Sequence, residues 1–358
     1  MNVLIGIIAF VVMLMVIVVI HEFGHFMVAK HFGVYCHEFS IGMGPALYQK
    51  EGKETIFSIR AIPLGGYVMM AGEDDGSQDE QTDDWLQNVP EDRKLYSKPA
   101  WQQVCVMVAG VVMNILLAWI LFVGISMYKG YVIEDALPVV AQIVEDSPAQ
   151  RAGLQEGDEI VKLSADGDTE DIETQYDISE FLQYHHDEVT VSVNRDDKIV
   201  ELSLTPYYSD EDGYYMIGIV SYSNVREIAW YESFKYGTID MIDTASSIFT
   251  SLGMLLHGKG TENLSGPVGI YTVTEKATSY GLLSYLTLCA MISVNIGIFN
   301  LLPIPALDGG RILILFIEKI FRRKIDRQVV ENIILASFVL LFGVLIYATF
   351  NDVTRLFS

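Results

Sequence analysis

The chain has 358 residues, of which 51% are hydrophobic, and its formal net charge is −23. A sequence this apolar is typical neither of a disordered protein nor of an ordinary soluble enzyme. The 46 acidic residues outnumber the 23 Lys and Arg, which argues against nucleic-acid binding because phosphate recognition needs an excess of positive charge. Three cysteines cannot form a disulfide framework.

Four apolar stretches are long enough to cross a bilayer, which takes about 20 residues. The first has no Lys or Arg before it and no small-residue cleavage site after it, so we interpret it as a retained helix and not as a signal peptide. The predicted transmembrane helices are residues 1–30, 99–128, 277–310 and 332–351.

Basic residues between the third and fourth spans predict the orientation of the chain. They are Lys319, Arg322, Arg323, Lys324 and Arg327. Because short cytoplasmic loops are enriched in Lys and Arg, residues 311–331 are predicted to form a cytoplasmic loop. Four spans then place both termini outside the cytoplasm, residues 31–98 inside it and residues 129–276 outside it.

The segment between the first two spans, residues 31–98, is predicted to lie against the cytoplasmic membrane face. Apolar and polar residues alternate over Cys36–Met70, with glycine-containing turns between them, which is typical of β-hairpins. Glu73–Asp92 is acidic and is predicted to be a solvated loop.

The extracytoplasmic region 129–225 contains a predicted β-rich domain over residues 138–207. Val189–Val193 and Ile199–Leu204 alternate as half-buried strands do. The stretch S-P-A-x-x-A-G-L-x-x-G-D-x-I, starting at Ser147, resembles bacterial PDZ domains, which bind extended chains by adding a strand to a sheet edge. By analogy the receiving edge lies near Val139–Val144; the alternative is a domain that serves only as a spacer or size filter.

Residues 226–276 are predicted to form an amphipathic helix and a connector. A fifth span there would have to bury Asp240 and Asp243, so a helix lying at the outer membrane interface is favoured. Its apolar face would consist of Ile239, Ile242, Ala245, Phe249, Leu252 and Leu256.

The first span contains His21-Glu22-Phe23-Gly24-His25. His21 and His25 lie one helical turn apart on the same face, where two imidazoles can bind one zinc ion. Glu22 lies beside that face and can take a proton from the attacking water. The alternative is a polar cluster that merely faces cytoplasmic water, but ionisable groups at a membrane-spanning helix are costly without a ligand.

A catalytic zinc usually has three protein ligands, so one more is needed. The favoured candidate is Asp308, which follows Pro303 and Pro305 at the end of the third span. The two prolines interrupt the helix, and irregular backbone at membrane depth is tolerated only beside protein or a wet cavity. His31 and His37 are less favoured ligands, and Asp308 could instead cap the helix that follows it.

These features together resemble the bacterial site-2 proteases, the intramembrane zinc metalloproteases that include the regulator of sigma-E protease. The matching motifs occur in family order over essentially the whole chain. They are His21 to His25, Phe39 to Pro45, Pro63 to Val68, the PDZ domain, Leu264 to Gly269, and Asn300 to Gly310. Two features depart from the family: Val111 replaces the usual proline after Ala109-Gly110, although Asn114 is retained, and only one PDZ domain fits.

The resemblance implies an α-helical polytopic membrane protein with four transmembrane helices, an inserted extracytoplasmic PDZ domain of α+β type, and cytoplasmic-side β-hairpins. It implies Zn²⁺ held by His21, His25 and Asp308, with Glu22 as general base. The substrate-binding candidates are Asn300, Pro303, Pro305, Gly42 and Gly44.

The implied partners are the lipid bilayer and single-span membrane proteins, such as anti-sigma factors or remnant signal peptides, cut after a first-site protease. The implied location is the bacterial inner membrane. The alternative function is a PDZ-bearing membrane adaptor or chaperone that has lost catalysis; intact Glu22 argues against it. A transporter is less favoured because no inverted repeat is apparent.

Overall fold

The computed structural model shows two compact units, each described here by itself. The first is Met1–Tyr128 together with Ser233–Ser358, and the second is Lys129–Glu232. Most of the predicted acidic loop, as well as Leu264 and Lys324, lies outside the described residues. The structure describes residues 3–73, 85–134, 137–209, 214–222, 224–256, 265–323 and 325–357.

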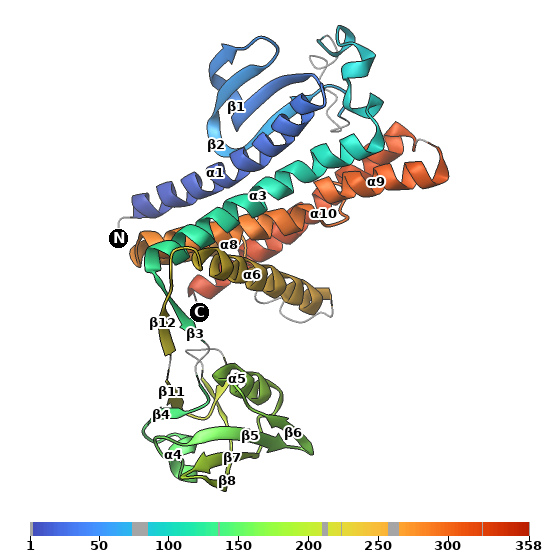
Figure 1. Cartoon of the computed structure of the whole chain (residues 1–358). Helices are drawn as coiled ribbons and strands as arrows, with labels where there is room; N and C mark the ends of the chain where they lie inside the picture. The colour runs from blue at the N-terminus through green and yellow to red at the C-terminus, as the bar shows by residue number, and fades with distance from the viewer. Residues whose placement is uncertain are drawn as a thin grey trace. The chain divides into compact units, whose positions relative to one another are not determined.

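Long apolar helices form the first unit and run side by side (Figure 1). They are α1 (Val3–His31), α3 (Ala100–Lys129), α8 (Leu282–Asn300) and α10 (Arg327–Phe357). Among the described helices these four are long and apolar enough to cross a membrane, so the prediction of four such helices is confirmed. Met13, Ile17 and Cys289 are buried where α1 packs against α8.

The amphipathic segment forms α6 (Ser233–Leu256), and α7 (Pro267–Ser279) follows it. Ile242 and Phe249 of its predicted apolar face are exposed, so that face stays free to meet lipid as predicted. A second stripe, Met241, Ala245 and Ile248, packs on α3 and α8, and Ala245 belongs to both sets. Lipid tails are as apolar as a protein core, so apolar spacing alone does not tell which stripe of a helix faces its neighbours.

Residues 311–331, predicted to be a loop, are largely helical. Helix α9 (Asp308–Phe321) occupies the first half, and α10 begins at Arg327. The charged residues of α9, such as Arg311 and Glu318, occur at helical spacing among aliphatic residues, as in an amphipathic helix. The loop was predicted only from the positive charge of this segment.

The segment after α1 forms two long strands, β1 (Cys36–Glu51) and β2 (Ile56–Met70), which pair with each other. The strands double back, so that Phe39 lies opposite both Phe57 and Val68. Gly42 and Gly44 have φ of +86° and +82°, a conformation that favours glycine, and they lie where the register of β1 shifts. The prediction of β structure here is thus confirmed.

A buried carboxylate ties this sheet together. Glu38 accepts hydrogen bonds from the side chains of Ser58, Arg60 and Tyr67, with the Arg60 Nη2–Oε1 distance at 2.7 Å. Burial raises the pKa of Glu38, but these three donors outweigh it and hold the pKa below its ordinary value. The carboxylate is therefore charged and fully used in joining both strands.

The second unit is built on a four-stranded sheet in the order β6-β5-β7-β8. Its core contains Val140, Leu163, Phe181, Val191 and Ile217. The remaining strands form the pairs β3–β12, β4–β11 and β9–β10. The strands are β3 (Tyr131–Glu134), β4 (Val140–Ile143), β5 (Glu159–Ala165), β6 (Asp168–Asp171), β7 (Val189–Arg195), β8 (Lys198–Leu204), β9 (Tyr207–Ser209), β10 (Tyr214–Met216), β11 (Ile219–Ser221) and β12 (Asn224–Glu227).

The motif that starts at Ser147 has a direct structural role. Ser147 caps the short helix α4 (Pro148–Ala152), and Gly153 ends it with φ of +84°. Asp158 is 1% exposed and its Oδ2 lies 2.6 Å from Arg195 Nη2, which joins the start of β5 to the end of β7. The helix α5 (Gln175–Tyr184) begins with a capping box at Thr174.

One sequence-based expectation for this unit is wrong and one is only narrowed. The strand edge near Val139–Val144 is partly occupied, because β4 pairs with β11 on one side and the bridge from Val139 to Glu159 takes up the start of the other side. The domain also extends beyond residue 207, since Ile217 belongs to its core and β11 completes the pairing. The alternation of apolar and polar residues along a strand does not show which distant strand it pairs with.

Candidate metal centre

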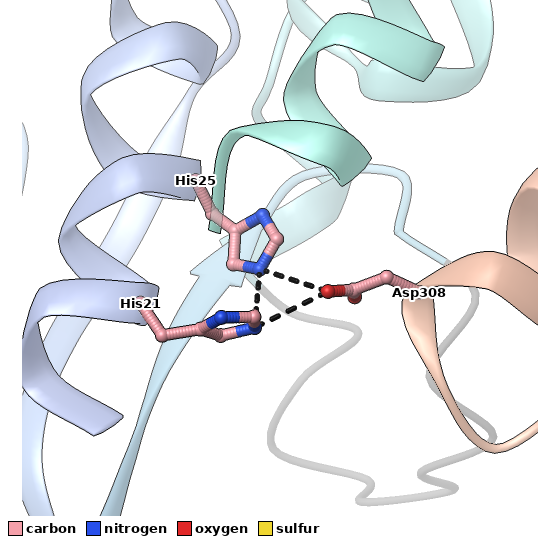
Figure 2. Close-up of side chains that lie close together, drawn as sticks. All are labelled: His21, His25 and Asp308. Atoms are coloured by element: carbon pink, nitrogen blue, oxygen red, sulfur yellow. Dashed lines mark hydrogen bonds and ion pairs between the residues drawn. The ribbon is translucent and has the colours of Figure 1, made fainter. Parts of the chain in front are cut away.

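Helix α1 places two imidazoles at one point within the first unit. His21 and His25 are each 7% exposed, and their Nε2 atoms lie 3.2 Å apart. The carboxylate of Asp308 meets both rings, with Oδ2 at 3.2 Å from His21 Nε2 and 3.4 Å from His25 Nε2 (Figure 2). The structure therefore brings together the three residues that the sequence suggested as ligands.

Asp308 reaches the histidines because the chain turns sharply between α8 and α9. Residues 301–307 fold back over the first turn of α9, and a Cβ on Gly309 would lie 2.2 Å from the Leu301 carbonyl oxygen. A Cβ on Gly310 would lie 2.1 Å from the Ile304 carbonyl oxygen. Only glycine fits at either position, so the two glycines after Asp308 allow the turn that aims it at α1.

The three ligand atoms fit a zinc ion. Ligands about 2.0–2.1 Å from a tetrahedral ion lie about 3.3–3.4 Å from one another. The observed separations of 3.2, 3.2 and 3.4 Å form such a triangle. Asp308 Oδ2 is buried beside the two imidazoles and accepts no hydrogen bond from the described residues. A buried carboxylate oxygen normally has a partner, and a metal ion would supply one here. Two nitrogens and one carboxylate oxygen are a donor set that zinc prefers.

Contacts from α3 orient the two imidazole rings. His25 Nδ1 lies 2.8 Å from the carbonyl oxygen of Val106, a bond that requires the proton on Nδ1 and leaves Nε2 free for a metal. Asn114 Nδ2 lies 3.4 Å from His21 Nδ1, and Asn114 Oδ1 has no partner among the described residues. With the amide oxygen and nitrogen exchanged, Oδ1 would accept a hydrogen bond from His21 Nδ1–H and fix the same tautomer there.

Two glycines let α1 and α3 approach closely enough for these contacts. A Cβ on Gly110 would lie 2.5 Å from His25 Nε2 and 2.7 Å from His21 Cε1. A Cβ on Gly24 would lie 2.5 Å from the Ala109 carbonyl oxygen. Sequence reasoning noted Ala109-Gly110 only as part of a family motif and missed that Gly110 lies directly on both rings.

A cavity of about 370 Å³ opens beside the three ligands. Glu22 lines it, one residue along the helix from His21, as do Asn300 and Arg311. The last residues of β2 also line it, namely Tyr67, Val68, Met69 and Met70. Arg311 is ion-paired with Glu73, another lining residue. Neither member of this pair was singled out from the sequence, because their 238-residue separation gives no local signal.

Of the substrate-binding candidates, Asn300 is brought to this cavity. Pro303, Pro305, Gly42 and Gly44 are not among its described lining residues. The two prolines belong to the turn before α9, and the two glycines bend β1, so the structure gives these four residues a role in chain direction.

The structure also shows where the alternatives considered for the third ligand lie. His37 stacks on Trp85 with ring centroids 4.4 Å apart, and His31 packs against Phe32, so neither histidine belongs to the cluster. Asp308 is the first residue of α9, and no side chain caps that helix. The capping explanation for Asp308 is therefore wrong.

Comparison with known proteins gives concordant matches. The family model described as Peptidase family M50 matches residues 9–344. A Clostridium acetobutylicum protein named as a zinc metalloprotease is 36% identical, with 98% of this chain and 97% of that protein covered. The regulator of sigma-W protease RasP of Bacillus subtilis is 29% identical, with 98% and 99% covered. A solved PDZ domain of an SdrC-like protein from Listeria innocua is 26% identical, covers 25% of this chain and 97% of that domain, and has a TM-score of 0.21.

Proposed function

This chain belongs to peptidase family M50, and from that premise we propose that His21, His25 and Asp308 hold its zinc ion and that Glu22 is the general base. The protein is a zinc-dependent intramembrane metalloprotease of the site-2 type, as the matches along the whole chain to zinc metalloproteases and RasP indicate. The observation that carries the residue assignment is the triangle of three ligand atoms beside Glu22.

When bound, zinc supplies Lewis-acid chemistry, polarising a carbonyl and making water acidic enough to attack it. Glu22 lines the cavity next to His21 and takes the proton from the attacking water. It then delivers a proton to the leaving amine, because the new amino terminus must be protonated to depart. The Val106 carbonyl holds His25 in the tautomer that keeps Nε2 unprotonated, and Asn114 does the same for His21 once its amide oxygen faces Nδ1.

The substrate is a single-span membrane protein or a remnant signal peptide, bound extended beside β2. A helical peptide bond is shielded by its own turn, so the substrate must unwind before water can reach it. Support comes from Tyr67 through Met70, which line the cavity at the end of β2 and offer a strand to pair with. Asn300, which lines the same cavity, then positions the substrate backbone by hydrogen bonding.

The protein resides in the bacterial inner membrane, with the site near its cytoplasmic face and residues 129–232 outside the cytoplasm. The basic residues after Glu318 support this orientation. The second unit either binds extended chains or limits the size of substrates, so that cleavage follows a first-site protease. RasP is named a regulator of sigma-W protease, which supports anti-sigma factors as one substrate class.

The test is Glu22→Gln in the full chain. The amide is nearly isosteric but cannot take a proton, so cleavage of a model transmembrane substrate should fall by ~10²–10⁴-fold or more. Zinc measured by mass spectrometry should stay at the wild-type level, because Glu22 is not among the three ligands. Cleavage near the wild-type rate would refute the role of Glu22.

The same pair of measurements separates the alternative function. A catalytically inactive adaptor or chaperone predicts that wild-type protein and Glu22→Gln are indistinguishable in proteolysis. Zinc-dependent cleavage by wild-type protein alone would exclude that alternative.

A further inference from the structure

A second cavity, of about 740 Å³, lies in the first unit where α3 and α10 begin and α9 ends. Helix α9 lies there beside the first turns of α3 and α10 (Figure 1). Glu73, Leu95, Met107 and Arg311 line both this cavity and the one beside the metal ligands. The proposed protease mechanism uses none of its other lining residues.

The charge that lines this cavity is positive in an otherwise acidic protein. Its lining carries Arg311, Lys319, Arg322 and Arg323 against the carboxylates Glu73 and Glu318. Both carboxylates are already engaged, because Glu73 pairs with Arg311 and Glu318 Oε1 accepts a hydrogen bond from the Ile325 backbone N–H at 2.9 Å.

Lys319, Arg322 and Arg323 have exposed side chains with no ion pair or side-chain hydrogen bond to any described residue. Arg322 stands at φ of +49°, at the left-handed position after α9 where glycine is favoured. Arg322 occupies this position although glycine is favoured there, and it is one of the residues that line the cavity.

The lining also contains aliphatic residues, namely Ile314 and Leu315 of α9 and Val330 and Ile334 of α10. A soluble anion would use only the cationic residues of such a cavity, and a detached hydrocarbon would use only the aliphatic ones. A ligand with a phosphate at one end and hydrocarbon at the other uses both.

We propose that this cavity binds one anionic phospholipid, with its phosphodiester on Lys319, Arg322 and Arg323 and its acyl chains against Ile314, Leu315 and Ile334. The cavity lies at the ends of helices that are long enough to span a membrane, where lipid headgroups are found. A zwitterionic lipid carries its own cation beside the phosphate, so it gains less from these three side chains.

The experiment uses full-length Glu22→Gln protein, so that lipid binding is measured whether or not the proposed protease mechanism holds. Delipidated protein in detergent is titrated with dioleoylphosphatidylglycerol or dioleoylphosphatidylcholine, and bound lipid is counted by native mass spectrometry. One phosphatidylglycerol should bind in preference to phosphatidylcholine. Removing two of the cations with Arg322→Gln/Arg323→Gln should weaken this binding about thirtyfold, at about 1 kcal/mol for each cation.

Two further variants test the position of the site. Lys50→Gln/Lys53→Gln removes two exposed cations from the β1–β2 hairpin and should leave lipid binding unchanged. Leu315→Trp fills the apolar side while it keeps every charge, and it should also weaken binding. If the lysine control weakens lipid binding as much as the arginine variant does, the lipid is attracted by the general positive charge of the protein and not by this cavity. That result would overturn the proposal.

Glycerol phosphate and an acidic peptide serve as competitors. Neither should displace phosphatidylglycerol at equal concentration, because neither has acyl chains for the aliphatic side of the cavity. Displacement by glycerol phosphate would identify a soluble-anion site, and displacement by the peptide a substrate-flank site. Either result would overturn the lipid assignment, as would equal binding of the two lipids.

Discussion

At the scale of single residues, the proposed metal centre depends on glycines that let backbone segments approach one another closely. Gly110 lies against both imidazoles, and Gly309 and Gly310 let the turn before α9 fold tightly. The three proposed ligands are therefore held in place by the fold itself. Preorganisation of this kind lowers the free-energy cost of binding the ion.

Asp308→Asn should lower bound zinc well below one ion per chain. The amide keeps the shape of the carboxylate but is uncharged and is a poor zinc ligand, and two imidazoles alone hold the ion loosely. Metal analysis of purified protein measures this directly. Asp243→Asn, at an exposed position on α6, is the matched control and should keep full zinc. Wild-type zinc in Asp308→Asn would remove Asp308 from the ligand set.

Gly110→Ala should also lower zinc content, and cleavage with it. The added methyl group would lie 2.5 Å from His25 Nε2, so a ring or the α3 backbone must move. Gly124→Ala changes the same helix at a site with nothing within 4 Å and should leave both properties unchanged. If both alanine variants bind zinc equally, the close approach of α3 is not needed for the site.

At the scale of elements, α10 holds the start of α7 through a buried carboxylate. Asp352 is 4% exposed, and its Oδ2 accepts hydrogen bonds from the backbone N–H groups of Gly266 and Gly269 at 2.8 and 2.7 Å. A Cβ on Gly269 would lie 2.6 Å from Asp352 Oδ1. The Ser265-Gly266-Pro267-Val268-Gly269 part of the family motif thus builds a helix start that a distant carboxylate caps.

Asp352→Ala should therefore destabilise the first unit by about 1–3 kcal/mol, because two buried N–H groups lose their acceptor. Asp352→Asn should have a smaller effect, since its amide oxygen still accepts a hydrogen bond but carries no charge. Thermal unfolding in detergent measures both, with Asp243→Ala as the exposed control. Equal midpoints for wild type and Asp352→Ala would show that α7 does not need this cap.

At the scale of the whole molecule, the four apolar helices and the basic residues after Glu318 predict one orientation in the membrane. Cysteines introduced at Asp168 and Asp197 should react with an impermeant maleimide on intact cells, whereas one at Arg323 should react only in opened cells. All three positions are exposed. Cys105 is exposed too and is first replaced by alanine. The reverse labelling pattern would invert the orientation.

Much of the molecule could be predicted from local patterns in the sequence. Four apolar stretches predicted the four candidate spans, and the spacing of His21, Glu22 and His25 predicted one helical face, because both depend on residues close together in the chain. Asp308 was predicted as a ligand from the proline-interrupted turn before it, and its carboxylate does lie at both imidazoles.

Only the tertiary structure decided what depends on residues far apart in the chain. The contact of Gly110 with both rings, the pairing of β4 with β11 and the packed face of α6 were not predictable from periodicity. A helical stripe or an alternating strand tells which residues share a face. It carries no information on which neighbour that face meets, because packing between distant segments makes that choice.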